Sequence, residues 1–342
     1  MTSLNLTQGQ AQSIIDKHNG NGRTVVALKE VVNNGYNYVR NNKTYIADLS
    51  ASPTEAATHS SYISIFEPPH TSSPYALNTL RTTAHLIKLI KDSQCLPLGE
   101  PFVDESASII PFPYLMTPTK KVASSELISL ADLYKSPILT PEQRVLVDLE
   151  IGACLGRLHS RVMNEYYGQP AVVPPADPSI SWQETFTHIV ETTLTAAEAA
   201  GYEFAYTSIR AALSRAIAFF LFDDVEVPSL IWFTGSSDDV YLKLGPTPSI
   251  AAVLPNMSRA VWGDPLMEGF FLERSEALME GYKNAGGEPL LVFPRQKTKR
   301  MWYDLVLALV VLLERGKTGP QATWALETIE KVTESLKNAP CY

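Results

Sequence analysis

The secondary structure that the sequence predicts changes near Pro118, from mainly strands to mainly helices, and this change limits the folds that the chain can adopt. Before Pro118, short runs of β-forming residues dominate, and Asn-rich and Gly-containing turn signals at 33–35 and 41–42 interrupt them. One helical pattern, at 78–91, lies among these runs. The predicted strands of this part are 24–27, 31–32, 38–39, 44–49, 62–66 and 109–116.

After Pro118, helical patterns take over. The first, at 141–162, begins with Thr140 as a cap and Pro141 in the first helical position. Further helices are predicted at 181–200, 205–221, 268–285, 299–314 and 321–336, with short β runs near Leu230, at 240–244 and at 250–254. Strands with one helix, followed by helices with one small sheet, indicate an α+β fold of two lobes. The predicted N-terminal lobe, 1–117, has an antiparallel sheet plus one helix, and the helical C-terminal lobe, 118–342, has its small sheet near 230–256.

Composition limits the partners of such a protein. A formal charge of −8 and a pI near 5.4 argue against nucleic acid, because phosphate binding needs concentrated Lys and Arg. The most apolar run, 305–313, is shorter than the roughly 20 residues that span a bilayer, so it predicts a buried helix and no membrane partner. Three scattered cysteines fit a reducing compartment, and the first residues lack the features of a secretory signal. We therefore expect a cytoplasmic protein.

The segment from Leu230 to Phe271 has the frame of a small-molecule kinase's catalytic block. It runs Leu-Ile-Trp-Phe-Thr-Gly-Ser-Ser-Asp-Asp-Val-Tyr-Leu and ends in Trp-Gly-Asp-Pro at 262–265. This order resembles the aminoglycoside phosphotransferase and choline kinase family, whose fold is the two-lobe protein-kinase-like fold. The 44–49 run is similar to that family's third strand, 111–116 to the strand before the hinge, and 151–160 to its Leu-x-x-Leu-His helix.

The resemblance implies that the catalytic residues of the family are absent here. Matched residue by residue, the family's His, catalytic Asp, metal-binding Asn, metal-binding Asp, phosphate-binding Lys and paired Glu fall on Trp232, Thr234, Asp239, Asn256, Asp48 and Thr83. Phosphoryl transfer depends on a Lys against the phosphates, on Mg²⁺ ligands and on an acceptor of the hydroxyl proton. Thr234 is too weak a base at neutral pH, and Asp48 repels phosphate. Pro118, at the hinge position, has no N–H to offer to an adenine.

The candidate site residues follow from this match. The catalytic candidates are Thr234, Asp238, Asp239 and Asn256, and the ligand-binding candidates are Asp48, Thr117, Trp232, Tyr241, Asp264 and Glu268. We predict no metal ion and no cofactor. For Asp264 we expect a capping role in its loop, and for His159 a structural role inside the helical lobe.

Three functions remain open. In the first, which we favour, the protein has lost ATP- and Mg²⁺-dependent phosphoryl transfer and acts on or binds a small-molecule metabolite in the inter-lobe cleft, as a biosynthetic enzyme of secondary metabolism would. In the second, it is a non-catalytic pseudokinase that scaffolds or binds a protein partner. In the third, it is an active small-molecule phosphotransferase with relocated catalytic groups. The first predicts an open pocket between the lobes, whereas the second allows side chains to fill it.

Overall fold

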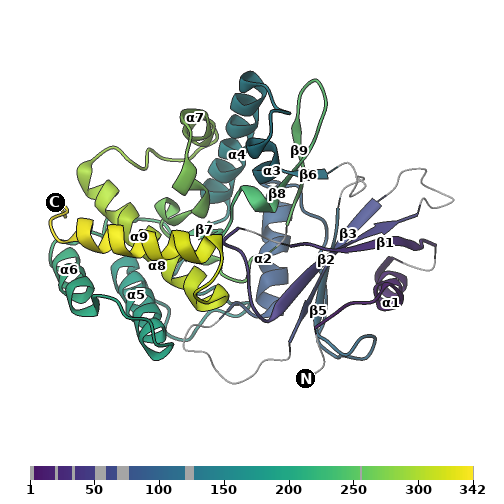
Figure 1. The fold of residues 1–342 in the computed structure, drawn as a ribbon, viewed down its shortest axis with the longest axis horizontal. Coiled ribbons are helices and arrows are strands. Elements are labelled where there is room, and N and C mark those ends of the chain that lie inside the picture. The colour runs from purple at the N-terminus through teal and green to yellow at the C-terminus, as the bar shows by residue number, and fades with distance from the viewer. Residues whose placement is uncertain are drawn as a thin grey trace.

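A computed structural model describes residues 4–19, 22–32, 35–50, 59–67, 77–119, 127–254 and 256–341. Asn33 and Asn34 of the predicted turn lie outside these residues. Within them, a five-stranded antiparallel sheet occupies the N-terminal part and helices dominate the C-terminal part, as the sequence predicts (Figure 1). Among the described residues, no helix has the length and apolar character needed to cross a membrane.

The five-stranded sheet has the order β1-β2-β3-β5-β4. Its strands are β1 (Val25–Glu30), β2 (Asn42–Leu49), β3 (His59–Phe66), β4 (Phe102–Asp104) and β5 (Tyr114–Pro118). The predictions at 24–27, 44–49 and 62–66 match strands, and the 109–116 run contains only the start of β5. The predicted strands at 31–32 and 38–39 are wrong, because these residues form a loop that docks on the other lobe.

Each face of the sheet has its own covering. Helix α1 (Gln8–Asn19), which the sequence pattern did not predict, covers one face with Ala11, Ile14 and Ile15. Its apolar residues pack on alternate residues of the strands, among them Tyr45, Ala47, Leu49, Ile63, Ile65, Tyr114 and Met116. The opposite face turns toward helix α2 (Leu80–Asp92) and the helical lobe, and α2 lies between the two lobes in Figure 1.

The helical lobe is built around one long buried helix. Helix α8 (Pro294–Arg315) contains the apolar run 305–313, whose first eight residues are almost completely buried. Around it lie α3 (Leu130–Lys135), α4 (Pro141–Arg161), α5 (Trp182–Ala199), α6 (Tyr206–Ala218), α7 (Glu276–Asn284) and α9 (Pro320–Leu336). The predicted helix at 268–285 begins instead as 3-10 turns at Pro265–Met267 and Gly269–Glu273, and α7 follows.

Two small sheets position the catalytic block. Strands β7 (Ser229–Ile231) and β10 (Val261–Gly263) pair with each other, while β6 (Leu127–Ser129), β8 (Val240–Lys243) and β9 (Ser249–Val253) form the second sheet. The turn from β7 to β8 contains a 3-10 helix at Ser237–Asp239. The 230–256 region therefore presents its loops toward the N-terminal sheet.

The strand order corrects one match made from the sequence. The 44–49 run was matched to the third strand, but it is the second strand, and β3 is the third strand before α2. Strand β3 reads His-Ser-Ser-Tyr-Ile-Ser-Ile-Phe and contains no Lys or Arg. Asp48, on the second strand, therefore does not occupy the third-strand position that the match gave it.

Candidate functional site between the lobes

Asn37, in the loop between β1 and β2, joins three of the predicted site positions. Thr234 Oγ1 donates to Asn37 Oδ1 at 2.7 Å, and Asn37 Nδ2 donates to Asp239 Oδ1 at 3.2 Å. Asn256 Nδ2 donates to the backbone oxygen of Asn37 at 2.8 Å. The Asn37 side chain is only 2% exposed. These four residues form one hydrogen-bonded group, here called the Asn37 cluster, in which Asn37, Thr234 and Asp239 are buried and Asn256 is half-buried.

Asp239 has an environment that disfavours its charge. It is fully buried, and its Oδ2 accepts hydrogen bonds from Ser236 N at 2.9 Å and from Ser236 Oγ at 3.2 Å. Burial raises the pKa of Asp239 to about 7, although the hydrogen bonds from Asn37 and Ser236 act in the opposite direction. A carboxyl group in this state is a weak ligand for a hard cation.

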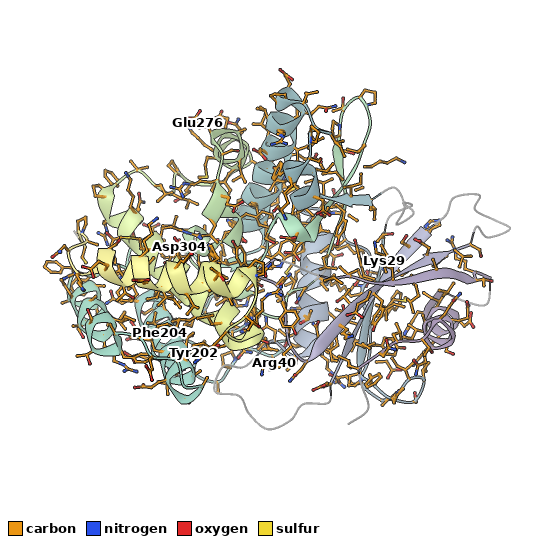
Figure 2. All side chains as sticks on the ribbon, viewed as in Figure 1. Lys29, Arg40, Tyr202, Phe204, Glu276 and Asp304 are labelled. Atoms are coloured by element: carbon orange, nitrogen blue, oxygen red, sulfur yellow. The ribbon has the colours of Figure 1, made fainter. Side chains whose placement is uncertain are left out.

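Hydrogen bonds also connect the loop that contains Asn37 to the C-terminal end of α8. Arg40 N donates to Glu314 Oε2 at 2.9 Å, and Arg315 Nη2 donates to the backbone oxygen of Gly35 at 2.9 Å. The Arg315 guanidinium also lies 4.5 Å from the ring centroid of Tyr38. Figure 2 labels Arg40 where the loop meets the helical lobe. In kinases such a loop covers the nucleotide phosphates, whereas here it packs directly on the catalytic block.

Apolar side chains fill the space between the sheet and the β8–β9 hairpin. Ile46 and Tyr62 from the sheet form a buried group with Ala252 and Leu254, here called the inter-lobe apolar cluster. Tyr241 packs against it, with its ring centroid 6.3 Å from that of Tyr62. Val31 and Leu127 pack at its edges. These side chains fill the space between this part of the sheet and the β8–β9 hairpin.

Two buried hydroxyl groups in this region make no hydrogen bond to any residue that the structure describes. Tyr62 and Thr117 pair directly across β3 and β5, are each 2% exposed, and have no partner for Tyr62 OH or Thr117 Oγ1. Burial raises the pKa of the Tyr62 hydroxyl well above its usual value, and burial does the same for Tyr241. Thr117 and Tyr241, both predicted to bind a ligand, therefore lie against the apolar cluster.

The hinge offers few backbone groups. Pro118 ends β5 and pairs with Ser61, while Thr119 N donates to the backbone oxygen of Ser60 at 2.9 Å. Gly99 lies so close that a Cβ atom on it would be 2.1 Å from the Pro118 oxygen, so only glycine fits there. Asp48, predicted to bind a ligand, accepts a 2.6 Å bond from Ser60 Oγ near this edge. The hinge groups are thus engaged within the protein.

Trp232 and Glu268 belong to a deeper polar network. Glu268 Oε2 accepts from Trp232 N at 2.9 Å and lies 3.3 Å from His159 Nε2, and His159 Nδ1 lies 3.0 Å from Tyr282 OH. The Trp232 indole donates to the backbone oxygen of Asn256 at 2.8 Å. All four side chains of the network are buried, so it braces the catalytic block from inside the lobe, as we expected for His159.

Asp264 has a similar structural environment. Its Oδ1 accepts from Leu266 N at 2.8 Å, which confirms the predicted cap, and its Oδ2 accepts from Tyr303 OH at 2.7 Å. Lys299 lies 2.7 Å from Asp264 and 2.6 Å from Asp224. Burial lowers the pKa of Lys299, but the two carboxylates outweigh this effect and raise it. Asp264 is therefore an anchor of the lobe, away from the inter-lobe space.

An open pocket remains beside the Asn37 cluster. This inter-lobe pocket has a volume of about 430 Å³ and extends from Gly35 and Tyr36 of the N-terminal loop to α3, α9 and the Ser236–Asp238 turn. Its wall includes Tyr134, Phe270 and Trp324, and its charged residues are Asp148, Asp238, Glu273 and Lys135. The rings of Tyr36 and Trp324 are 4.6 Å apart and join the two lobes. Asp238 is thus the one catalytic candidate that lines this pocket.

Three carboxylates and one ammonium group give the inter-lobe pocket an acidic character. Burial raises the pKa of Asp238, while Lys135 lowers it. Asp148 is held by hydrogen bonds from Tyr134 and Ser275. In the part of the chain that the structure describes, no group of three or more His, Cys, Asp or Glu is placed to hold a metal ion. The pocket suits an organic cation that contacts aromatic rings better than a phosphate.

Solved structures with the same fold come from small-molecule kinases. The chain matches a putative aminoglycoside phosphotransferase from Ralstonia eutropha with a TM-score of 0.58 and 12% identity, over 98% of each chain. It matches aminoglycoside phosphotransferase APH(4)-Ia with a TM-score of 0.58 and 14% identity, over 98% of this chain and 100% of the other. The chain has the aminoglycoside phosphotransferase fold. A choline/ethanolamine kinase family protein from Mesorhizobium loti is also similar, with a TM-score of 0.53 and 11% identity, over 98% and 96% of the two chains.

Comparison by sequence adds no family assignment. No family model matches the chain, and no curated protein matches it. At 11–14% identity the similarity to the solved structures concerns the fold. The predicted α+β, two-lobe kinase-like fold is thereby confirmed.

Several residues of the site escaped the sequence reasoning. Asn37, Tyr62, Tyr36 and Trp324 were not among the candidate residues. The one signal available was the position of Asn37 two residues after the Gly of the turn, where a side chain can point back at the catalytic loop. Trp324 lies 288 residues after Tyr36, and no local pattern could have paired them.

Proposed function

We propose that this protein binds a cationic small-molecule metabolite in the inter-lobe pocket and does not transfer phosphate from ATP. The observation that carries the proposal is the division of the inter-lobe space. The Asn37 cluster and the inter-lobe apolar cluster occupy the nucleotide side, while the side next to Tyr36 and Trp324 stays open. Among the described residues between the lobes, the side next to Tyr36 and Trp324 therefore has room for a ligand.

The loss of phosphoryl transfer follows from chemistry as well as space. Strand β3 has no Lys or Arg, Thr234 replaces the catalytic carboxylate, and Asp239 is buried with a raised pKa. Phosphoryl transfer needs cations against the phosphates and a carboxylate at the attacking hydroxyl. If Asp239 were the catalytic carboxylate of a phosphotransferase, its hydrogen bond with Asn37 would first have to break, because Asp239 is fully buried.

The cationic character of the ligand rests on the pocket wall. Asp238 and Glu273 face a space that is also lined by Tyr36, Phe270 and Trp324. A protonated amine gains from a carboxylate and from the face of an aromatic ring together. Several neighbours of this fold are named for aminoglycosides or choline, and both of those compounds carry a positive charge. Asp238 is the carboxylate through which a reaction on such a ligand would run, if the protein is a biosynthetic enzyme.

Calorimetric titration tests the proposal. Choline and an aminoglycoside are titrated in turn against the whole protein, with glucose as an uncharged comparison. We expect saturable binding of an amine, weakened at least about tenfold by Glu273→Gln combined with Asp238→Asn, since two charge contacts are lost. Glu276→Gln, on α7 outside this pocket (Figure 2), is the matched control and should leave the affinity unchanged. Equal binding by the double variant, or binding of glucose as tightly as the amines, would refute the cationic site.

A second candidate function is a non-catalytic scaffold. The observation in its favour is an exposed aromatic pair next to a helix end, Phe219 and Phe220, which are 49% and 62% exposed. Phe220 has a φ of 53°, a conformation that costs a non-glycine residue about 1 kcal/mol. Its backbone oxygen accepts a hydrogen bond from Arg295, near the exposed Phe293. A scaffold would lose its protein partner on Phe220→Ser without any change in amine binding, which separates the two candidates.

A further inference from the structure

A second pocket lies beside Phe233 and the 258–261 segment of the same block. It has a volume of about 430 Å³ and lies between α5, the 167–169 segment and the 258–261 segment. Its apolar lining includes Phe233, Ala260, Val261, Met267 and Ile189. None of its lining residues also lines the inter-lobe pocket. The two pockets are therefore separate sites, and this one, the α5 pocket, has no part in the function proposed above.

Hydrogen bonds hold the walls of the α5 pocket in place. Asn78 N donates to the backbone oxygen of Ser258 at 2.8 Å, and Asn78 Nδ2 donates to the oxygens of Met257 and Ala260 at 2.8 and 2.9 Å. Gly168 and Trp262 exchange two backbone hydrogen bonds of 2.9 Å each. Such walls are formed before a ligand arrives, so little ordering cost opposes binding.

The charges around the α5 pocket are balanced. Arg259, which lines it, forms an ion pair with Glu314, and Glu184 lies at the solvent-exposed turn of α5. The buried apolar part of the lining is Phe233, Ala260, Val261 and Met267, each no more than 7% exposed. The buried cation of the lining, Arg259, is already paired with Glu314, so a charged ligand would lose its hydration here without gaining an unpaired counter-ion from that ion pair. The polar groups at the rim, Gln169 and His188, remain for hydrogen bonding.

We propose that the α5 pocket is a second binding site and that it takes an uncharged, mainly apolar small molecule. A volume of about 430 Å³ falls within the range of known ligand pockets, which are mostly apolar with a few polar groups. The pocket also contacts the region of the Asn37 cluster. Ser258 Oγ donates to Asn256 Oδ1 at 2.6 Å, and Phe233 precedes Thr234 in the chain. A ligand on Phe233 and Ser258 thus lies one residue or one hydrogen bond away from that cluster.

Fluorescence titration with N-phenyl-1-naphthylamine, which is uncharged at neutral pH, tests this proposal on the whole protein. We expect saturable binding at one site. Ile189→Trp, which places a large ring in the pocket, should weaken that binding at least about tenfold, because the ring fills volume that the ligand needs. His188→Trp at the rim is a second blocking variant, in case Ile189→Trp fails to fold. Thr195→Trp, exposed on the same helix and outside the pocket, is the matched control and should leave the affinity within about twofold.

The results of the naphthylamine titration can be distinguished from those of the amine titration, because each tests a different pocket. Absence of saturable binding, or equal binding by both blocking variants and by the control, would overturn the proposal. Tighter binding of the charged analogue 1-naphthyltrimethylammonium would overturn the uncharged class. Choline and the aminoglycoside should not displace the naphthylamine, because the two pockets share no lining residue. Displacement would mean that the naphthylamine occupies the inter-lobe pocket and would also overturn the proposal.

Discussion

Asn37 Oδ1 accepts a 2.7 Å hydrogen bond from Thr234 Oγ1, so a side chain of the loop between β1 and β2 meets a side chain of the turn between β7 and β8. Both side chains are almost completely buried. The contact thereby joins the N-terminal sheet to the helical lobe in the space where the proposed function excludes a nucleotide. The following predictions test the consequences of this contact.

Replacing Asn37 should destabilise the protein. Asn37→Ala removes the partner of Thr234 Oγ1 and one donor to Asp239, and both groups stay buried. Leaving buried polar groups unpaired costs about 1–3 kcal/mol each, so we expect a loss of roughly 2–4 kcal/mol in the free energy of unfolding. Urea denaturation measures it. Asn284→Ala, on the exposed surface of α7, should change stability by less than about 0.5 kcal/mol. A loss in Asn37→Ala no larger than in this control would show that the contact carries little energy.

Tyr62→Phe should be neutral or stabilising. The Tyr62 hydroxyl is buried without a hydrogen-bond partner, and removing such a group relieves its desolvation penalty. We expect a gain of up to about 1 kcal/mol, seen as an equal or higher melting temperature. Tyr62→Ala should instead cost about 3–5 kcal/mol, because it leaves a cavity in the inter-lobe apolar cluster. A clear loss of stability in Tyr62→Phe would mean that the hydroxyl has a partner.

Asp239 should make stability depend on pH. Its folded-state pKa of about 7 exceeds the value near 3.8 of an unfolded Asp, so between these values the native state binds more protons than the unfolded state. The stabilising contribution of the neutral form is fully present below the unfolded pKa and decreases as pH rises through about 7. The free energy of unfolding should decrease by at most about 4 kcal/mol in total, because each unit of pKa difference corresponds to about 1.4 kcal/mol. Urea denaturation at several pH values should show this decrease, and Asp239→Asn should flatten it. An equal pH slope in the variant would assign the effect to other groups.

The sequence reasoning succeeded where structure is local or set by pattern. The helices at 141–162 and 181–200 and the buried 305–313 run follow from periodicity and capping, since Thr140 and Ser181 cap their helices as Ser and Thr commonly do. Helix α1 escaped because Gln, Ser and Asp outnumber its apolar residues, three of which nevertheless cover the sheet. The third-strand position was assigned one strand too early, to the 44–49 run, after the runs at 31–32 and 38–39 had also been predicted as strands.

The sequence indicated the candidate residues of the 230–271 segment but not the residue that connects them. Thr234, Asp239 and Asn256 could be named as candidates from the order of residues in the 230–271 segment, and the structure brings them together around Asn37. Their common partner Asn37 is almost 200 residues away from Thr234 and follows from how the lobes close, which no local pattern encodes. For the same reason, the open or filled state of the inter-lobe space could not be read from the sequence. Tyr62, Tyr241 and Leu254 fill it from three different strands or strand ends.

Removing Lys299 should destabilise the helical lobe and leave the inter-lobe pocket intact. Lys299→Met leaves the buried Asp264 carboxylate without its nearest cation, which costs about 3–5 kcal/mol. The double variant with Asp264→Asn should recover part of that loss, since it also removes the unpaired charge. Chemical denaturation measures stability, and the amine affinity should stay unchanged in whatever fraction is folded. Weaker amine binding by the folded double variant would place Asp264 in the ligand site after all.

The central claim is that ATP has no place between these lobes, and a thermal shift titration with ATP, with and without Mg²⁺, tests it most directly. A ligand at about 100 times its dissociation constant stabilises a protein by about 2.7 kcal/mol, which moves the melting temperature by several degrees. We expect no shift with ATP and Mg²⁺ up to millimolar concentrations, because the Asn37 cluster and the inter-lobe apolar cluster occupy the site. A concentration-dependent rise in melting temperature that requires Mg²⁺ would contradict the account.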